Sequence, residues 1–539
     1  MDVLIAAIAP EVEATLRDTL VDVLGRLWPV ETRQDVVHVE SGVAIAASRT
    51  LAAADVIGPP RLHHDGGRVW AKRWDWATLA SLPPASFGEH RGAWGSAASG
   101  RWSCNGVQWN TATQTLEAVR DAFGEGSIWY AIDGPRFALA SHPAPLLALE
   151  WVSNEPDPID AQLVGLPLDR GDRSGWQMLR RLPAGHRLIW RDGRIEITRW
   201  WQLGTPPPAQ RCDDADWLES ARTALERAVA RRIPAAGVVG GHLSGGLDST
   251  AVSILAGRAL APLDRRIHTF SHVPAVRWNP PRPGDETPYV EAALQAIPNA
   301  ISHLCSDAAG DGTRFDGRAL SAHDRAVRDS ASGAGVCLML SGWGGDEGIS
   351  FNGDGYLARQ LLRLQLLPAL RWCWQYGGGT PRGMVGALLN KLVYQQFGLL
   401  RPTPVHPNPS TRTYRERILG LSGEARAVAL RSYRASWRLR AGVGAHENQR
   451  RLLSSPHIAN RIDADAEWSI PAGFCFRYPL LDPEVIQVAL QVPERLLVLN
   501  GRTRTLLREA MRGLYPDLIQ DRRSKFVSHP KPPVFRALK

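Results

Sequence analysis

The stretch GVVGGHLSGGLDSTAVSILAGRAL, residues 237–260, decides the fold of this chain. Its first seven residues form a short apolar run that is typical of a buried strand. The next six, Ser244-Gly245-Gly246-Leu247-Asp248-Ser249, are too rich in glycine and polar groups to extend that strand. The remainder is a proline-free, largely apolar run that favours a helix. The stretch therefore predicts a strand, a tight turn and a helix.

The surrounding sequence repeats this alternation. Further strands are predicted by RRIHTFSHV (265–273), AISHLCS (300–306) and GVCLMLSG (335–342), and helices by DDADWLESARTALERAVARRI (213–233) and ETPYVEAALQAI (286–297). Apolar strands that alternate with helices indicate a doubly wound parallel sheet, so we expect an α/β domain. From about residue 350 to 520 we expect mainly helices with Arg-rich outward faces. Residues 310–319 and 402–410 are predicted to be loops.

The first half of the chain has a different pattern. GSIWYAIDGPRFALAS (126–141) and HRLIWRDGRIEITRWW (186–201) each predict a hairpin with an Asp-Gly turn. We therefore expect a strand-rich, layered α+β domain over residues 1–205. The run of glycine, threonine and three prolines at 204–208 cannot continue a strand or a helix, so we interpret it as a linker. The α/β domain is then predicted over residues 206–539.

Composition excludes several classes of protein. The chain has 539 residues, 44% of them hydrophobic, and no apolar run long enough to predict a membrane span. The start lacks the features of a signal peptide, so we expect a cytoplasmic protein. Six widely spaced cysteines predict neither a zinc site nor a disulfide framework. The net charge of +9 comes without a basic tail, so we interpret it as scattered and expect no nucleic-acid binding.

The turn at 244–249 has the chemistry of an anion site. Gly245 and Gly246 allow the backbone to bring its N–H groups onto a phosphate, and the following helix adds its positive end. Ser244 and Ser249 add hydroxyl donors. Asp248 would repel a phosphate, so beside one it implies a bridging cation such as Mg²⁺. The pattern lacks the GK[ST] of a Walker loop, so it predicts a different nucleotide site.

SGGLDS in this setting resembles the pyrophosphate loop of N-type ATP pyrophosphatases, which have the adenine nucleotide alpha hydrolase-like fold. LMLSGWGGDEG (338–348) resembles the SGxGxDE segment of asparagine synthetases. The resemblance implies ATP and Mg²⁺ as cofactors, with Asp248 and Asp346 as the two magnesium ligands. It also implies that Leu243, Ser271, Ser341 and Gly342 lie near the nucleotide, together with Phe270 and His272.

A third stretch, residues 476–526, resembles the C-terminal part of asparagine synthetase-like domains. The matching residues are Arg477, Pro479, Leu481, Asp482, Arg504, Leu507, Arg508, Glu509, Ala510, Pro516, Arg523 and Lys525. The resemblance implies that Lys525 reaches the phosphates as a compact, mobile positive charge and is catalytic together with the two aspartates. A solvated loop lysine is the alternative, because three of the five lysines lie in the last fifteen residues.

The N-terminal half resembles, more faintly, the N-terminal-nucleophile (Ntn) glutamine amidotransferase domain of the same family. That domain needs a cysteine directly after the initiator methionine, with the α-amine as its base. Here Asp2 holds that position and the first cysteine is Cys104. The resemblance therefore implies a degenerate amidotransferase domain that makes no ammonia from glutamine and serves as a scaffold or recognition surface.

Three relatives share the synthetase motifs: asparagine synthetases, β-lactam synthetases and lasso peptide cyclases. Trp343 stands where β-lactam synthetases carry a tyrosine base, and Cys475 stands where many relatives have a glutamate, so the general base stays open. SGWGGDE and DETPY (285–289) look most like the lasso cyclases. That resemblance implies ATP-dependent macrolactam formation on a precursor (core) peptide, with a leader peptidase and a leader-recognition protein as partners. The β-lactam and asparagine reactions remain alternatives, and so does a non-catalytic scaffold.

Overall fold

The structure is a computed structural model. It describes residues 105–163, 171–204, 212–274, 285–306, 322–394, 420–438 and 442–522, the pairs 314–315 and 318–319, and in the first 104 residues 3–8, 19–22, 24, 33–40, 43–50, 63–65 and 68–72. Within these residues no helix is long and apolar enough to cross a membrane. Cys305, Cys337, Cys373 and Cys475 are free thiols, and Cys104 lies outside the described residues.

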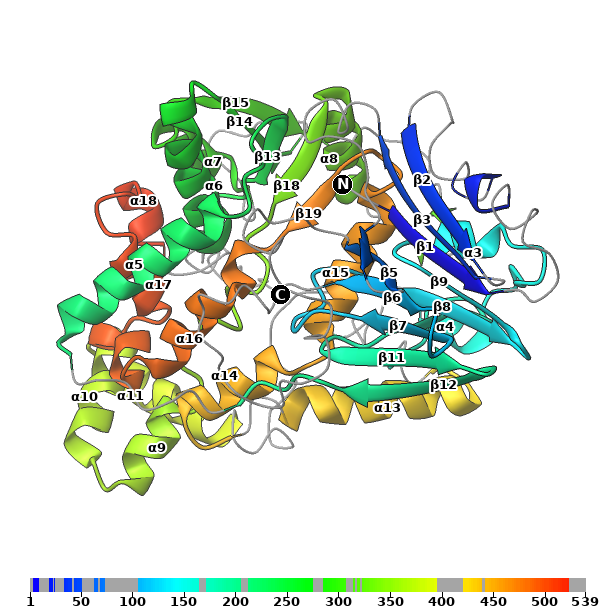
Figure 1. Cartoon of the computed structure of the whole chain (residues 1–539). Helices are drawn as coiled ribbons and strands as arrows, with labels where there is room; N and C mark the ends of the chain where they lie inside the picture. The colour runs from blue at the N-terminus through cyan, green and yellow to red at the C-terminus, as the bar shows by residue number, and fades with distance from the viewer. Residues whose placement is uncertain are drawn as a thin grey trace, which may run out of the picture.

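A five-stranded parallel sheet forms the centre of the C-terminal half (Figure 1). Its strands are β13 (Val238–His242), β14 (Ile267–His272), β15 (Ala300–Cys305), β18 (Val336–Leu340) and β19 (Cys475–Arg477). Their order is β15-β14-β13-β18-β19, and every neighbouring pair is parallel. The order reverses between β13 and β18, as in doubly wound sheets. The predicted strands are confirmed, but β19 was not predicted as a strand.

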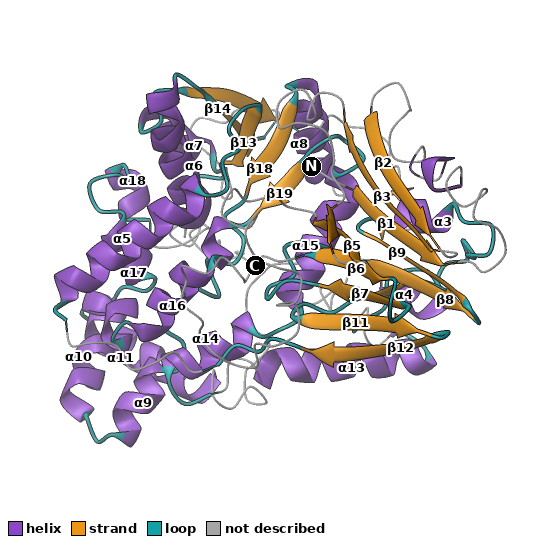
Figure 2. Cartoon of the chain, in the orientation of Figure 1, coloured by secondary structure: helices purple, strands orange, loops and turns teal. Residues whose placement is uncertain are grey.

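Helices cover both faces of this sheet (Figure 2). They are α5 (Asp214–Ala230), α6 (Leu247–Leu260), α7 (Thr287–Gln295) and α8 (Ala322–Gly333). On one face Val239 and Leu338 pack in one core cluster with α5, α6 and α7. On the other face Met339 packs with Val327 and Ala331 of α8 in a second cluster. Alternation of side chains along the strands thus gives two cores, as the α/β prediction requires.

Helix α5 begins as the sequence predicts. Asp213 is its N-cap and accepts a hydrogen bond from the backbone N–H of Asp216, whose side chain returns the contact in a capping box. The helix ends at Ala230, before Pro234. The described residues between 350 and 520 are mainly helical, as expected, apart from β19. They contain α9 (Tyr356–Leu362), α10 (Leu366–Tyr376), α11 (Pro381–Leu388), a π-helix (Leu389–Tyr394), α13 (Gly423–Arg438), α14 (Ala445–Leu453), α15 (His457–Ser469), α16 (Pro483–Gln491), α17 (Thr505–Ala510) and α18 (Asp517–Gln520).

The N-terminal half contains two six-stranded antiparallel sheets, which confirms its strand-rich character. The first has the order β10 (Arg180–Arg181), β8 (Trp129–Asp133), β9 (Arg136–Ala140), β1 (Val3–Ile8), β3 (Val43–Thr50), β2 (Arg33–Glu40). The second has β12 (Arg194–Arg199), β11 (His186–Arg191), β7 (Thr115–Val119), β6 (Gly106–Asn110), β5 (Arg68–Lys72), β4 (His63–Asp65). Short helices α3 (Pro143–Leu147) and α4 (Pro158–Leu163) follow β9. A shared core cluster joins the sheets and includes Trp109 of one and Phe137 of the other.

Both predicted hairpins are confirmed, and one predicted loop is corrected. β8 pairs with β9 and β11 with β12, with turns at the two Asp-Gly sites. Within residues 310–319, however, β16 (Arg314–Phe315) pairs with β17 (Arg318–Ala319). The Asp-Gly between them favours a tight hairpin turn, which the loop interpretation overlooked. Residues 402–410 and the prolines at 206–208 lie outside the described residues.

Buried ion pairs join the two halves of the molecule. Arg232, at the end of α5, lies 3.2 Å from Glu125 of the N-terminal half and 2.6 Å from Asp482. Arg120 of the N-terminal half lies 2.6 Å from Asp463 on α15. All five side chains are at least nine-tenths buried. Removing one partner of such a pair strands a buried charge, so these contacts tie the N-terminal sheets firmly to α15 and to the segment after β19.

Candidate active site

Two glycine-rich turns meet at the edge of the parallel sheet where the strand order reverses. The turn 244–249 follows β13 and the turn 341–348 follows β18, its neighbour in the sheet. Parallel strands end at the same edge, and ligands of doubly wound folds bind in the crevice at this reversal. The topology therefore places the two predicted motifs side by side at the position expected for a nucleotide.

The first turn is shaped by its glycines. Gly245 has φ +64°, and a Cβ there would lie 2.4 Å from the Cβ of Tyr289, so only glycine fits. Gly246 is the N-cap of α6 and makes no side-chain cap bond. The hydroxyls of Ser244 and Ser249 lie 2.9 Å apart and close the turn. The turn thus presents a helix N-terminus and backbone amides, the elements of a phosphate site.

The second turn lies directly against Asp248. A Cβ on Gly342 would come within 3.0 Å of the Asp248 Cβ, and one on Gly345 would come within 2.1 Å of its Oδ1. Glycines at these positions therefore let the backbone of one motif contact the carboxylate of the other. Asp248 has 15% of its side chain exposed and Asp346 has 44%, so both carboxylates can be reached from solvent.

Arg504 brings the two carboxylates together. Its Nη1 forms an ion pair with Asp346 and lies 3.6 Å from Asp248 Oδ2. Arg504 is the N-cap of α17 and has φ 60°, a left-handed conformation that costs a residue with a Cβ free energy. Strain of this kind concentrates at functional sites. The two aspartates that the sequence predicts as metal ligands therefore both lie against the positively charged guanidinium of Arg504.

This pair of aspartates fits a magnesium ion held mainly by phosphate. Mg²⁺ in nucleotide sites takes one or two carboxylates and completes its shell with phosphate oxygens and water. In the described part of the chain no group of three or more His, Cys, Asp or Glu side chains could form a metal site by itself. The donor set therefore suits a metal that arrives with a nucleotide better than a permanent protein-bound metal.

The remaining predicted nucleotide residues surround the two turns. Leu243 is buried, and its N–H donates to the carbonyl of Phe270 on β14 over 2.9 Å. Ser271, next along β14, is buried. The N–H of Ser341 donates to the carbonyl of Arg477 on β19 over 2.9 Å, which ties the second turn to the third motif. These contacts hold the ends of β13, β14, β18 and β19 in one layer.

The predicted catalytic lysine, Lys525, lies outside the described residues. The last residue described, Arg522, is buried against the first turn. Its Nη1 donates to the carbonyl of Gly245 over 2.8 Å, its Nη2 lies 2.8 Å from Glu286, and its guanidinium lies 4.0 Å from the centre of the Tyr289 ring. The chain therefore passes the phosphate turn three residues before Lys525.

Tyr515 holds the first residue of α6 in place through a hydrogen bond. Its hydroxyl donates to the carbonyl of Leu247 over 2.8 Å. Burial raises the pKa of Tyr515 well above its ordinary value, and the negative charge of Asp248 raises it further. The hydroxyl therefore stays protonated and serves as a permanent donor. This residue holds the helix whose N-terminus faces the turn, and the sequence motifs gave no indication of it.

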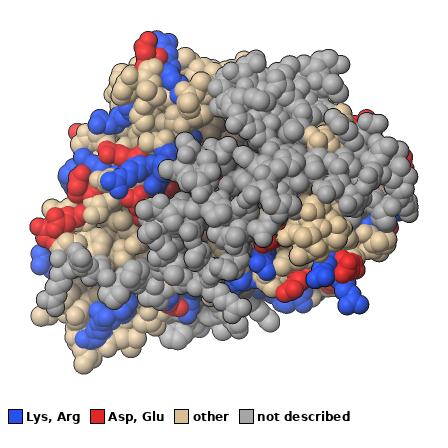
Figure 3. Space-filling view, viewed as in Figure 1, with Lys and Arg blue, Asp and Glu red and all other residues tan. Residues whose placement is uncertain are grey.

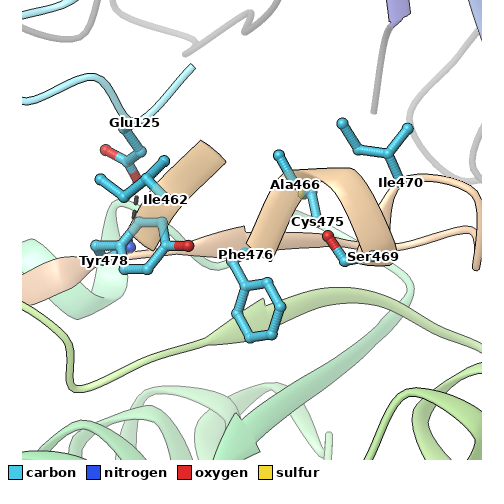
Figure 4. A pocket seen from close by; sticks show the side chains of 8 residues that line it. All are labelled: Glu125, Ile462, Ala466, Ser469, Ile470, Cys475, Phe476 and Tyr478. Atoms are coloured by element: carbon cyan, nitrogen blue, oxygen red, sulfur yellow. Dashed lines mark hydrogen bonds between the residues drawn. The ribbon is translucent and has the colours of Figure 1, made fainter. Parts of the chain in front are cut away.

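Cys475, which stands where the sequence resemblance places a glutamate in many relatives, lies beside a small enclosed space of mixed polar and apolar lining. Cys475 on β19 is buried and lines a cavity of about 10 Å³ with Glu125, Ile462, Ala466, Ser469, Ile470, Phe476 and Tyr478 (Figure 4). Glu125 accepts a hydrogen bond from the Tyr478 N–H over 3.2 Å, the dashed line in the figure. A space of this size holds no more than a water molecule, so β19 offers no room for a substrate on this side.

A histidine lies beside Trp343 instead. His457, the first residue of α15, has its Nε2 2.9 Å from Oε1 of Glu347, and its ring lies edge-on to Trp343 with centres 6.0 Å apart. Glu347 is buried, whereas His457 has 34% of its side chain exposed. Glu347 Oε2 and Trp343 Nε1 are buried and have no hydrogen-bond partner among the described residues. A carboxylate-oriented imidazole thus faces the second turn.

Sequence reasoning missed His457 and Tyr515, and it did not predict the contacts that Arg504 makes. Arg504 was recognised only as part of a pattern, and nothing in that pattern indicated a contact with both aspartates. His457 lies 110 residues from Glu347, and a lone histidine carries no signal before the fold is known. A larger cavity, of about 320 Å³, lies between the N-terminal half and α15, and none of the predicted site residues lines it.

Comparison with known proteins agrees with the motifs. A family model described as asparagine synthase matches residues 220–533, more than half of the chain. The chain belongs to the asparagine synthase family. The matched span contains both glycine-rich turns, the two aspartates, Arg504, His457 and Lys525. The family assignment therefore covers every residue proposed for the site.

Individual relatives are distant. The chain is 24% identical to asparagine synthetase [glutamine-hydrolyzing] 3 of Bacillus subtilis (strain 168) over 205 residues, which are 36% of this chain and 33% of that protein. Among solved structures, an allosteric regulatory enzyme of purine biosynthesis matches with 12% identity and a TM-score of 0.26 over 60% of this chain and 84% of that one. Glutamine phosphoribosylpyrophosphate amidotransferase from B. subtilis matches with 11% identity and a TM-score of 0.25 over 63% and 90%. Both TM-scores are far below 0.5, so these likenesses are too slight to define a shared fold.

Proposed function

We propose that this chain is an ATP-dependent, AMP-forming amide ligase, and specifically a lasso peptide cyclase. The observation that carries the ligase chemistry is the meeting of the turns 244–249 and 341–348 at the sheet edge, with Asp248 and Asp346 joined through Arg504. A phosphate cradle beside two carboxylates suits an ATP whose pyrophosphate is released. The same geometry speaks against a non-catalytic scaffold, which would need neither feature.

In the proposed reaction a carboxylate oxygen of an Asp or Glu side chain attacks the α phosphorus of ATP. The bond to the bridging oxygen breaks, and pyrophosphate leaves from the cradle formed by Ser244, Gly245, Gly246 and Ser249. Bound Mg²⁺ would be held by Asp248 and Asp346 and would neutralise the pyrophosphate charge. Lys525 would add positive charge where it develops in the transition state. The product of this step is an acyl-adenylate.

The second step joins the N-terminal amine of the same peptide to the activated carboxyl group. The amine nitrogen attacks the acyl carbon, AMP leaves, and the nitrogen loses one proton. His457, oriented by Glu347, lies at the second turn and would accept that proton. A peptide α-amine has a reference pKa near 8, so a strong base is not required. Holding amine and anhydride together supplies much of the rate.

Three features favour a peptide substrate over the small substrates of other relatives. Asp2 stands where the resemblance of the N-terminal half places the nucleophilic cysteine that makes ammonia from glutamine. Trp343 cannot act as the tyrosine base of a β-lactam synthetase. The motifs SGWGGDE and DETPY look most like those of lasso cyclases. The proposed partners are a precursor (core) peptide, a leader peptidase and a leader-recognition protein, and the proposed compartment is the cytoplasm.

The decisive experiment is mass spectrometry of a candidate core peptide after incubation with the enzyme, ATP and magnesium. A cyclase removes one water from the peptide and releases AMP and pyrophosphate in equal amounts. Release of AMP with aspartate and ammonia, but no change in the peptide, would favour an asparagine synthetase. Ring closure of a β-amino acid derivative would favour a β-lactam synthetase. A chain that releases no AMP with any of these substrates would be a scaffold.

A further inference from the structure

The helices α9, α10 and α11 form a tip of the molecule, far from the N-terminal sheets (Figure 1). Of the fourteen large apolar side chains that are exposed among the described residues, nine lie between Leu362 and Leu389. Leu364 and Leu367 are 82% and 81% exposed. Isolated exposed leucines are ordinary, but a concentration of this kind marks a surface that binds something apolar.

The apolar residues follow the period of the helix. In α10, Leu366, Leu370 and Trp374 are four residues apart and all exposed, while Ala369, Trp372 and Cys373 are buried against the rest of the molecule. Residues four apart lie on one face of a helix, so α10 has one apolar face that packs into the molecule and a second apolar face that is exposed. Only one of these faces contributes to the core.

The sequence of these helices and of the stretch that follows them carries most of the net charge of the chain. Between Asp354 and Glu416 the sequence has eight Lys or Arg residues and no Asp or Glu, a net charge of +8 over residues 355–415. The whole chain has 63 basic and 54 acidic residues, a net charge of +9, so the rest of the chain contributes only +1. The composition alone suggested that the net positive charge is scattered along the sequence. Its excess instead falls within residues 355–415.

Among the described basic residues of this stretch, Arg359 and Lys391 form ion pairs with Glu494 and Asp354, and the other three border the apolar surface. Arg363, Arg371 and Arg382 are exposed. Figure 3 shows blue and tan side chains at this end of the molecule, at its lower left. Exposed leucine and tryptophan bordered by arginine are the composition of helices that lie in the headgroup region of an anionic bilayer. No described helix is long and apolar enough to span the membrane, so contact would be at its surface.

We propose that the surface formed by residues 362–374 docks the enzyme onto an anionic lipid membrane. The exposed leucines would enter the acyl boundary, and the arginines would contact lipid phosphates. A lipid surface fits better than a protein partner for two reasons. The surface is a projecting tip, for which a protein would need a matching hollow. It is also dominated by leucine, which is under-represented among the residues that carry protein–protein affinity.

The test uses the full-length enzyme and flotation with phospholipid vesicles. The protein should float with phosphatidylcholine vesicles in which about a third of the lipid is phosphatidylglycerol, and the bound fraction should fall with salt. Vesicles of pure phosphatidylcholine should bind the protein at least about tenfold more weakly than the anionic vesicles. The double variant Leu364→Ser/Leu367→Ser should lower binding to anionic vesicles by about tenfold or more. It removes two apolar side chains whose transfer from water into the bilayer would favour binding. Arg363→Gln/Arg371→Gln should remove the preference for anionic lipid.

Leu263→Ser is the matched control. Leu263 is also highly exposed, at 58%, but lies next to α6 and outside the surface, so this variant should bind like the wild type. Circular dichroism and the melting temperature establish that each variant is folded. The proposal is wrong if the wild type fails to float with anionic vesicles, or if the Leu364/Leu367 variant binds as well as the control. A different outcome would be a wild-type protein that forms dimers and binds no vesicles, with a Leu364/Leu367 variant that is monomeric. That result would identify a second copy of the chain as the occupant of the surface.

Discussion

The parallel sheet and the two antiparallel sheets differ in where their strands end. All five strands of the parallel sheet run the same way, so the segments after β13, β14, β18 and β19 reach one edge. In the antiparallel sheets successive strands end at opposite edges, and the described connections β8–β9 and β11–β12 are tight hairpins rather than loops that converge on one edge. Chemistry is therefore expected at the first edge, whereas the N-terminal sheets contribute buried contacts to α15 and to the segment after β19.

The largest effect is expected from the two aspartates. Asp248→Asn and Asp346→Asn each remove one negative charge from the proposed Mg²⁺–pyrophosphate site and should reduce product formation below detection. Each should leave the fold intact, because an amide can replace a carboxylate at nearly the same volume. Mass spectrometry of the peptide and the melting temperature measure the two effects separately.

Either aspartate would lose its assignment if its variant retained near wild-type cyclisation with an unchanged magnesium requirement. Asp517→Asn is a suitable control. Asp517 begins α18, within the family match but outside the two glycine-rich turns. This variant should cyclise at the wild-type rate.

A smaller effect is expected from Lys525. A cation placed where charge develops acts on the transition state, and removing one such group typically costs on the order of 3 kcal/mol, or about a hundredfold in rate. Lys525→Ala should lower the cyclisation rate by that amount at saturating ATP and peptide. Lys525→Arg should rescue poorly, since the planar guanidinium is larger and directs its hydrogen bonds differently.

Lys531→Ala serves as the control for this prediction and should be nearly neutral. Lys531 is also a lysine near the end of the chain, six residues beyond Lys525, but it is not part of the family pattern. Equal rates for the Lys525 and Lys531 variants would return Lys525 to the role of a solvated loop lysine.

The difference between the two regions also explains what the sequence could predict. The parallel strands and their motifs were found because each is a local pattern of apolar residues, glycine and carboxylate. β19 was missed as a strand because it has only three residues and pairs with β18, whose partner residues lie 137 positions earlier in the chain (475 − 338 = 137). The contact between Arg504 and the two aspartates is equally non-local. Such features depend on tertiary packing, which periodicity does not report.

A more modest effect is expected from His457. If it accepts a proton from the attacking amine, His457→Asn should slow amide formation by about tenfold, less than the usual contribution of a general base because the amine is already partly neutral. Adenylation should continue, so exchange of labelled pyrophosphate into ATP in the presence of peptide should be unchanged. Raising the pH should narrow the difference, because more amine is then neutral without help.

Loss of exchange in the His457 variant would instead indicate damage to the nucleotide site. Asn460→Ala provides the comparison. Asn460 lies three residues after His457 on α15, and it lines the cavity beside the N-terminal half rather than the second turn. This variant changes a side chain of the same helix and should leave both exchange and amide formation near the wild-type level.

The smallest expected effect tests the N-terminal sheets. The resemblance of the N-terminal half to a glutamine amidotransferase domain implies that Asp2 replaces the nucleophilic cysteine, and a carboxylate there is not expected to attack the glutamine amide. Adding glutamine, or ammonia, should therefore leave the rate of cyclisation unchanged, and the pure enzyme should release no glutamate from glutamine. Asp2→Cys is the informative variant, because a single thiol without the rest of an amidotransferase site should restore nothing. Glutamate release by the wild type would overturn the prediction that this half is a degenerate amidotransferase domain that serves as a scaffold or recognition surface. It would also mean that the antiparallel sheets hold a site of their own, and the contrast with the parallel sheet would then fail.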